Sequence, residues 1–133
     1  MYRLVAAVAL TAALLLAGCG EPDPVKVRGE VVRMRIDEYR LLPRQIEVRS
    51  PRVRLVMTDR GILTHNVKVF STTETDAEDK PLEIGEGTPT AHPGETVVSD
   101  ELDLKPGRYR LACSIANHDD LGEHALLIVR GRS

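Results

Sequence analysis

Apolar and charged residues alternate in short runs from about residue 25 onward. The clearest runs are 32–36, 46–48 and 53–57, in which every second residue is Val, Leu, Ile or Met and most residues between them are Arg or Glu. A period of two predicts strands with one face in water. Pro43 and Pro51 interrupt the runs at positions where turns are needed.

The same pattern resumes in the second half of the chain. Alternation at 109–113 and an uninterrupted apolar run at 125–129 predict two more strands, the second of them buried. Many short strands without helical periodicity predict an all-β fold, a sandwich or a barrel. Between 71 and 92 the alternation disappears and the residues are polar and acidic. We expect a long connection or small insertion there, with one short helix near 76–83.

The first 18 residues differ from the rest and form no part of the predicted domain. Arg3 is followed by an uncharged run of Leu, Val, Ala and Thr, which is shorter than the about 20 residues needed to cross a bilayer. A charged start, a short apolar stretch and a small-residue end are typical of a secretory signal peptide. The alternatives are a signal peptide without lipidation and an uncleaved anchor.

The end of this segment, Leu16-Ala17-Gly18-Cys19, resembles the lipobox of bacterial lipoproteins. The resemblance implies lipidation of Cys19 and cleavage before it. We therefore expect a signal peptide at 1–18, a lipidated cysteine and tether at 19–30, and one domain at 31–133. The protein would be exported and anchored through lipid to the outer face of a bacterial membrane, in the periplasm or at the cell surface.

The composition argues against several functions. The formal net charge is −2, and 18 Lys and Arg are spread among 20 Asp and Glu without a basic block. Aromatic residues make up 3% of the chain, with no Trp and one Phe, so neither electrostatics nor stacking favours a nucleic-acid partner. No nucleophile and base set, phosphate loop or catalytic zinc motif is present, so we expect no enzyme. We expect a monomer.

Three residues have the pattern of a metal site. If Cys19 carries lipid, Cys113 is the only free thiol in an oxidising compartment, where it must be buried or bound. Cys113 and His118 flank a predicted loop between two strands, and His65 stands at another predicted strand end. Two imidazoles and one thiolate form the trigonal set that suits copper in both of its common oxidation states. Each residue alone has a plainer interpretation, the cysteine as a small buried hydrophobe and the histidines as hydrogen-bonded or solvated side chains.

Longer stretches around these residues resemble the cupredoxins, the blue-copper family. The matching segments are His65-Asn66-Val67, the approach to the cysteine from Leu104 to Ile115, His118, and Leu127-Ile128-Val129, so the likeness extends from about Arg33 to the end. It implies a Greek-key β-sandwich, one copper ion per domain, electron transfer and a redox partner protein.

One departure from the family pattern concerns the axial ligand. Cupredoxins commonly place a methionine four or five residues after the second histidine, whereas this chain has no methionine after Met57. Glu123 occupies the axial place in the register that aligns the last strand best, and His124 is the alternative. Neighbouring residues on a strand face opposite ways, so both cannot reach the metal. A glutamate ligand resembles the nitrosocyanin branch and would lower the reduction potential; an empty or water-filled position stays open.

Two other functions compete with electron transfer. A harder ligand set favours copper delivery, storage or sensing, and zinc bound by His65, Cys113, His118 and Glu123 is chemically reasonable. His92 lies in the polar connection, where we expect it to be solvated rather than to take part in metal handling.

Overall fold

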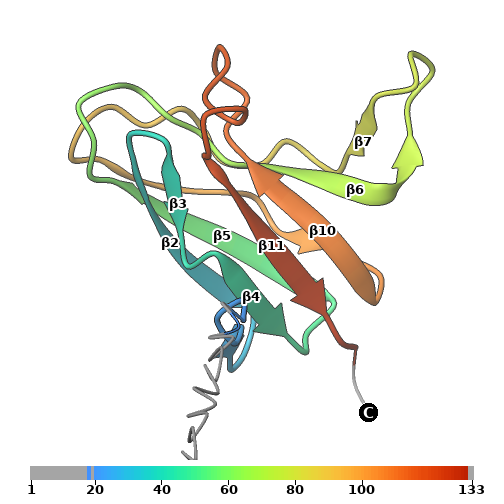
Figure 1. The fold of residues 1–133 in the computed structure, drawn as a ribbon. Coiled ribbons are helices and arrows are strands. Elements are labelled where there is room, and N and C mark those ends of the chain that lie inside the picture. The colour runs from blue at the N-terminus through green and yellow to red at the C-terminus, as the bar shows by residue number, and fades with distance from the viewer. Residues whose placement is uncertain (1–17, 19, 132–133) are drawn as a thin grey trace, which may run out of the picture.

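The computed structural model describes residue 18 and residues 20–131, which form eleven strands and no helix (Figure 1). The predicted lipidation site Cys19 and the predicted signal peptide, apart from residue 18, lie outside the described residues. The strands are β1 (Val25–Val27), β2 (Val31–Asp37), β3 (Arg40–Leu42), β4 (Gln45–Val48), β5 (Arg52–Asp59), β6 (Lys68–Thr75), β7 (Pro81–Glu83), β8 (Thr96–Val98), β9 (Leu102–Asp103), β10 (Gly107–Ala112) and β11 (His124–Val129). The predicted all-β fold is confirmed.

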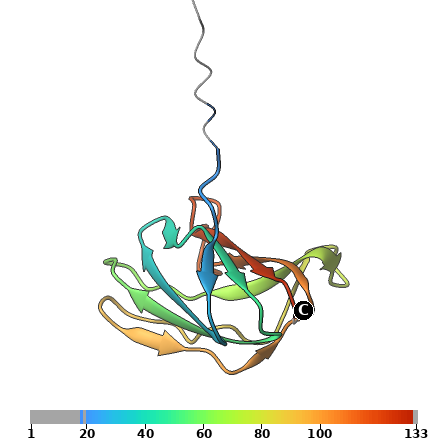
Figure 2. The ribbon, with the colours of Figure 1, turned by 90° about the horizontal axis from the view of Figure 1, so that it is seen from below.

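The strands form two mixed sheets that face each other (Figure 2). One sheet has the order β1-β4-β11-β10-β6-β7, and the other has the order β3-β2-β5-β8, with β9 paired to β5. The pairs β1–β4, β4–β11 and β2–β5 are parallel, and the remaining pairs are antiparallel. The hairpin between β2 and β3, the segment after β5 and the loop between β10 and β11 lie at the same end of the sandwich (Figure 1).

The core between the sheets consists of the apolar members of the alternating runs. Along β2, buried and exposed residues alternate strictly until the last position, as the sequence pattern predicts for a strand with one wet face. Facing strands of the two sheets contribute fully buried side chains, and burying each one stabilises the fold by about 1.5–3 kcal/mol. The largest of these apolar residues are Ile36, Leu41, Ile46, Leu55, Met57, Leu104, Leu111 and Leu127.

The folded part of the chain begins before the boundary expected at residue 31. Strand β1 (Val25–Val27) pairs in parallel with β4, with Val25 opposite Ile46 and Val27 opposite Val48. Its short alternation belongs to the period-two pattern, which begins at residue 25. Residues 25–27 of the predicted tether are therefore part of the sheet.

The helix expected near 76–83 is wrong. Strand β6 continues to Thr75, and β7 begins at Pro81 and pairs with it, so the segment is a hairpin that projects from the sandwich (Figure 1). A turn connects them, in which Oδ1 of Asp76 accepts hydrogen bonds from the amides of Glu78 and Lys80, each at 2.9 Å. A local side-chain acceptor of this kind competes with helix formation.

The rest of the polar connection is ordered along β6 rather than forming a loose loop. The amide of Ile84 donates to the carbonyl of Val69, and the amide of Thr88 donates to that of Val67, at 2.8 and 2.9 Å.

Within the described part of the chain, no helix has the length and apolar character needed to cross a membrane.

Candidate metal centre

Strand register places Cys113 opposite Glu123. The β10–β11 ladder ends with Ala112 opposite His124, and the amide of Cys113 continues it by donating to the carbonyl of Glu123 at 3.0 Å. Residues directly opposite each other on antiparallel strands share a face, and this is the face of the buried Leu111. The thiol and the carboxyl therefore both point into the sandwich, with residue exposures of 2% and 0%.

The loop between these two strands turns back so that His118 reaches the same place. The amide of His118 donates to the carbonyl of Ile115 at 3.2 Å, and the amide of Glu123 donates to the carbonyl of His118 at 3.1 Å. Gly122 has φ = 120°, and a Cβ there would lie 2.7 Å from the carbonyl oxygen of Tyr39. Glycine is required at this position because both the backbone angle and the close approach exclude a side chain.

His65 belongs to the segment between β5 and β6, and its backbone is held by a bridge to Ala91. The two residues exchange amide to carbonyl hydrogen bonds of 3.1 and 2.8 Å. Asn66 then joins this segment to the cysteine loop: its Oδ1 accepts the amide of Ser114 at 2.9 Å, and its Nδ2 donates to the Ser114 hydroxyl at 2.9 Å. The two segments that carry the candidate ligands are thus connected directly beside the cluster.

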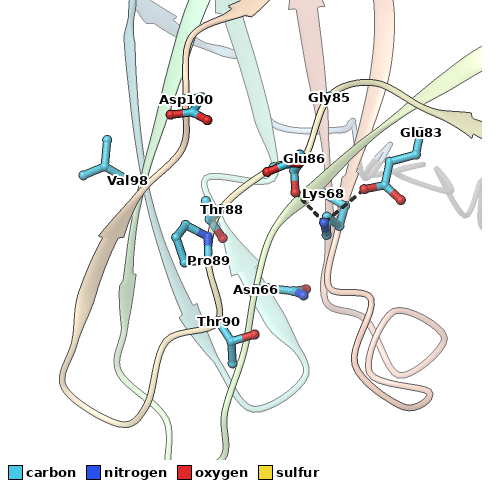
Figure 3. Close-up of a pocket in the computed structure, with 11 residues that line it drawn as sticks. Asn66, Lys68, Glu83, Gly85, Glu86, Thr88, Pro89, Thr90, Val98 and Asp100 are labelled. Carbon is cyan, nitrogen blue, oxygen red and sulfur yellow. Dashed lines mark hydrogen bonds and ion pairs between the residues drawn. The ribbon is translucent and has the colours of Figure 1, made fainter.

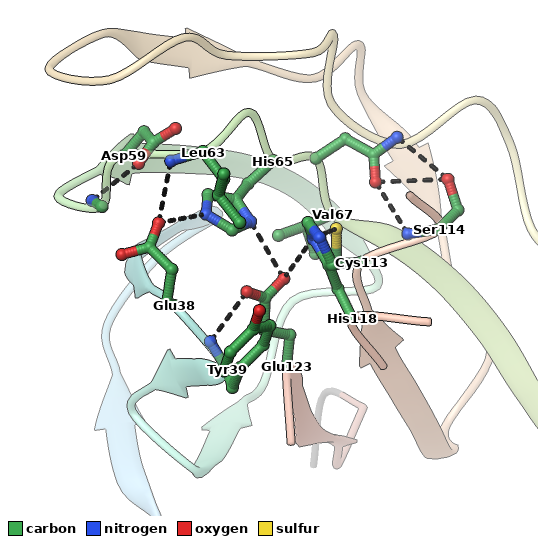
Figure 4. A network of polar contacts seen from close by, with 12 residues as sticks. Glu38, Tyr39, Asp59, Leu63, His65, Val67, Cys113, Ser114, His118 and Glu123 are labelled. Carbon is green, nitrogen blue, oxygen red and sulfur yellow. Dashed lines mark hydrogen bonds and ion pairs between the residues drawn. The ribbon is translucent and has the colours of Figure 1, made fainter. Parts of the chain in front are cut away.

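The structure brings the four residues predicted as ligands together. The ligand atoms of His65, Cys113, His118 and Glu123 all lie within 4.8 Å of one another, and all four residues are buried (Figure 4). Oε2 of Glu123 lies 3.0 Å from Nδ1 of His65 and 3.4 Å from Nδ1 of His118. Sγ of Cys113 lies 3.7 Å from Nδ1 of His118.

These distances fit a single metal ion. Nitrogen, oxygen and sulfur ligands bind such ions at about 2.0–2.3 Å, so two ligands of one tetrahedral ion lie roughly 3.3–3.8 Å apart. Three of the contacts, at 3.0, 3.4 and 3.7 Å, are close to that range, and the remaining pairs of donor atoms lie within 4.8 Å. One soft thiolate with two imidazoles suits copper, and the added carboxylate oxygen is the hardest member of the set.

Burial controls the chemistry of the thiol. Desolvation raises the pKa of Cys113 to about 11, although the backbone amides of Asn66 and Ile115 oppose this by hydrogen bonding to the sulfur. In the metal-free protein the thiol is therefore protonated at neutral pH. Because thiolate is the form that binds metal ions, an ion bound by Cys113 would displace that proton.

Two further residues contact the cluster, and the pattern of the sequence did not single them out. Oε1 of Glu38 lies 3.2 Å from Nε2 of His65, and the amide of Tyr39 donates to Oε1 of Glu123 at 2.9 Å (Figure 4). The Tyr39 ring meets the His118 ring edge-on, with centroids 5.9 Å apart. Glu38 and Tyr39 form the tip of the β2–β3 hairpin, and only the folding of that hairpin against the cluster reveals these contacts.

Glu38 is held as an anion by its surroundings. The hydrogen bond from the Leu63 amide is the largest influence, and with those from His65 and Ile62 it lowers the pKa of Glu38 to about 2 despite opposing desolvation. The amide bonds from Ile62 and Leu63 to Oε1 measure 2.7 and 2.9 Å.

The other two histidines considered from the sequence lie outside the cluster. Nδ1 of His124 lies 3.1 Å from the carbonyl oxygen of Asp119, on the opposite face of β11 from Glu123, as the alternation of strand residues predicts. His92 is exposed, and its Nδ1 lies 3.2 Å from Oε2 of Glu95.

A cavity of about 550 Å³ lies next to Asn66, but none of the four clustered side chains lines it (Figure 3). Its one lysine, Lys68, is paired with Glu83 at 3.0 Å and also bonds to the carbonyl of Glu86. The other charged residues of its lining, Glu86 and Asp100, are acidic, so this cavity offers no unpaired cation to an anionic ligand.

The two facing sheets have the cupredoxin fold, and the cluster of His65, Cys113, His118 and Glu123 lies at one end of it. Comparison of the sequence with protein-family models gave no match, and neither did comparison with curated proteins. Solved structures are similar: a dithionite-reduced auracyanin from Roseiflexus castenholzii has 14% identity and a TM-score of 0.63, covering 76% of this chain and 97% of that one.

Two more structures agree with that comparison. Auracyanin B has 16% identity and a TM-score of 0.61, over 83% of this chain and 92% of that one. Auracyanin A of Chloroflexus aurantiacus, described as a blue copper protein, has 18% identity and a TM-score of 0.59, over 75% of this chain and 99% of that one. At these identities the likeness establishes the fold, and the chemistry is argued from the cluster itself.

Proposed function

We propose that this protein is an extracytoplasmic, membrane-anchored copper protein that transfers single electrons. The metal ligands would be His65, Cys113 and His118, with Glu123 in the axial position. One observation carries the proposal: two imidazoles, a thiol and a carboxyl, from separate parts of a cupredoxin fold, meet with their ligand atoms within 4.8 Å in a buried site. Electron transfer, rather than catalysis on a substrate, is the use that this arrangement favours.

The surrounding residues suit this role. Bound copper supplies one-electron chemistry by cycling between Cu(I) and Cu(II). The buried side chains exclude water, and the sheet ladder and the bonds between Asn66 and Ser114 limit movement of the ligands between the two states. Little reorganisation is what fast electron transfer requires.

His118 is the ligand side chain nearest to solvent, with 10% exposure against 0% for those of His65 and Glu123. Exposed apolar side chains surround this end of the molecule, on the loops that contact the cluster: Tyr39, Ile62, Leu63 and Leu121. We infer that a redox partner protein docks at this apolar rim and exchanges electrons through His118.

An absorption spectrum with Cu(II) tests the metal assignment. The full chain, extracted in detergent, should develop an intense visible thiolate-to-copper band at one equivalent of Cu(II), with reversible reduction. Cys113→Ser is the control and should lack the band. A colourless protein with stoichiometric copper would contradict the proposal.

Glu123 is the observation that favours a second candidate, copper delivery, storage or sensing. Its carboxylate contacts both histidines, and a hard ligand favours retention of Cu(II) over rapid cycling. Slow or irreversible electrochemistry together with ready transfer of copper to a chelating acceptor would support this candidate over electron transfer.

Membrane anchoring is a separate part of the proposal and rests on the lipobox-like segment that ends at Cys19. Mass spectrometry of the N-terminal peptide should show a lipid-modified Cys19 and no preceding residues. Cys19→Ser should abolish the modification. An unmodified Cys19 in membrane-extracted protein would remove the anchor from the proposal and leave the metal site unaffected.

A further inference from the structure

The carboxylate of Glu38, at the tip of the β2–β3 hairpin, contacts both the backbone that leads to His65 and the His65 ring. Its Oε1 accepts hydrogen bonds from the amides of Ile62 and Leu63 and lies 3.2 Å from Nε2 of His65. The contact joins residues 27 positions apart in the sequence. The same oxygen therefore organises the segment leading to His65 and contacts its imidazole ring.

The direction of the hydrogen bond to His65 follows from the chemistry of the carboxylate. An ionised carboxylate accepts hydrogen bonds and donates none, so the ring nitrogen facing it must carry the proton. A proton on Nε2 makes Nδ1 the atom for a metal ion, and Nδ1 faces Oε2 of Glu123 at 3.0 Å; a proton shared by these two atoms in the metal-free protein is the one that the ion would displace. Carboxylates that orient metal-bound histidines in this way also increase the basicity of the ring.

Gly61 leaves room for the Glu38 carboxylate because it has no side chain. A Cβ at Gly61 would lie 2.1 Å from Oε1 of Glu38 and 2.7 Å from its Cδ. The atoms in the way are the end of a flexible side chain, so a methyl group at position 61 would displace the carboxylate more readily than the backbone. Glycine at position 61 therefore allows the Glu38 carboxylate to lie beside the His65 ring.

We propose that Glu38 is a positioning residue of the metal centre, which keeps the proton on Nε2 of His65, directs Nδ1 toward the ion and lowers the reduction potential. The inference rests on the proposed function for its metal. A negative charge hydrogen-bonded to a ligand stabilises the more positive, oxidised ion, so the carboxylate favours Cu(II) over Cu(I).

Two variants of the full chain remove the contact in different ways. Glu38→Gln removes the charge but keeps an acceptor, and Gly61→Ala keeps the charge but occupies the place of the carboxylate. Asp37→Asn is the matched control, because Asp37 is the neighbouring carboxylate, has 30% side-chain exposure against 27% for Glu38, and pairs with Arg40 instead.

Nitrogen-15 NMR of the metal-free protein is the first measurement. In the wild type and in Asp37→Asn, the His65 ring should show a slowly exchanging proton on Nε2. In Gly61→Ala this proton should exchange faster and shift upfield. A wild-type ring with its proton on Nδ1 alone would overturn the inference, whatever the protein does with copper.

The second measurement is made on the copper-loaded protein. Glu38→Gln and Gly61→Ala should raise the reduction potential and weaken copper binding by about 10- to 100-fold, whereas Asp37→Asn should change both much less. Equal effects in all three variants, or none in the first two, would show that Glu38 acts as a surface charge only. A wild-type protein that binds no copper but shows the expected Nε2 proton would remove the proposed function and retain the orienting role of Glu38.

Discussion

Nδ1 of His65 and Oε2 of Glu123 lie 3.0 Å apart, although the two residues are 58 positions apart in the sequence and both side chains are fully buried. A buried carboxyl group is costly unless it is paired or bound to a metal. The imidazole satisfies it in the metal-free protein, and the same two atoms face the place that an ion would occupy. Glu123 therefore belongs to the site rather than to the core.

Glu123→Gln should alter the metal site without emptying it. An amide oxygen is a weaker donor than a carboxylate, so we expect a changed visible spectrum with Cu(II) and a higher reduction potential. His124→Gln, on the other face of β11, is the control and should leave both unchanged. Identical spectra for Glu123→Gln and the wild type would show that Glu123 does not bind the ion.

Removal of copper should destabilise the protein. A ligand that binds only the folded state stabilises it by about 2.7 kcal/mol at 100 times its dissociation constant. Thermal unfolding followed by circular dichroism should show a lower Tm after treatment with a chelator, restored by one equivalent of Cu(II). Cys113→Ser should show a much smaller difference between the two conditions; an equal difference would place the stabilising copper elsewhere.

The thiol of Cys113 should be nearly inert in the metal-free protein. Its pKa of about 11, against 9.0 for the ordinary thiol, lowers the thiolate fraction at pH 8 by about 100-fold. The rate of alkylation should therefore rise about tenfold per pH unit up to pH 11, because only the thiolate reacts. Peptide mapping by mass spectrometry after iodoacetamide measures this rate, and the denatured protein is the reference. A folded rate near the denatured one would contradict the burial.

Asn66→Ala should weaken the connection between the two ligand segments. The substitution removes the acceptor of the Ser114 amide and the donor to its hydroxyl, so we expect a loss of about 1–3 kcal/mol in the free energy of unfolding and a broader copper spectrum. Ser114→Ala, at an exposed residue, removes only the hydroxyl and should cost less. Denaturant titrations of the two variants give the comparison, and a reversed order would refute it.

Strands were predictable because each depends on a short, regular pattern. The runs at 32–36, 53–57 and 109–113 contain the alternation that a sheet with one wet face requires, and all three are strands or strand ends. The helix near 76–83 failed because polar composition without periodicity does not distinguish a helix from a hairpin whose turn is held by Asp76. The alternation at 25–27 is present in the sequence, but three residues are too few to distinguish a strand from an extended tether.

The candidate ligands differ in how far the sequence determined them. Cys113, His118 and His65 stand out by residue type and by their places at strand ends, whereas Glu123, with His124 as the alternative, was indicated by the resemblance to cupredoxins in the last strand. The sequence does not reveal Glu38, because a glutamate on a turn has no local pattern to distinguish it.

The sequence by itself determined the strands and the available donor side chains, including the thiol of Cys113, since each of these depends on residue type and on neighbours in the chain. Only the tertiary structure decided which atoms meet: Nδ1 of His65 contacts Oε2 of Glu123, and Nε2 of the same ring contacts Oε1 of Glu38. It also showed that His124 lies outside the cluster, with its Nδ1 near the carbonyl of Asp119. The reason is physical: hydrogen bonds and coordination act over about 3 Å, and the pairing of strands distant in sequence determines which atoms come that close.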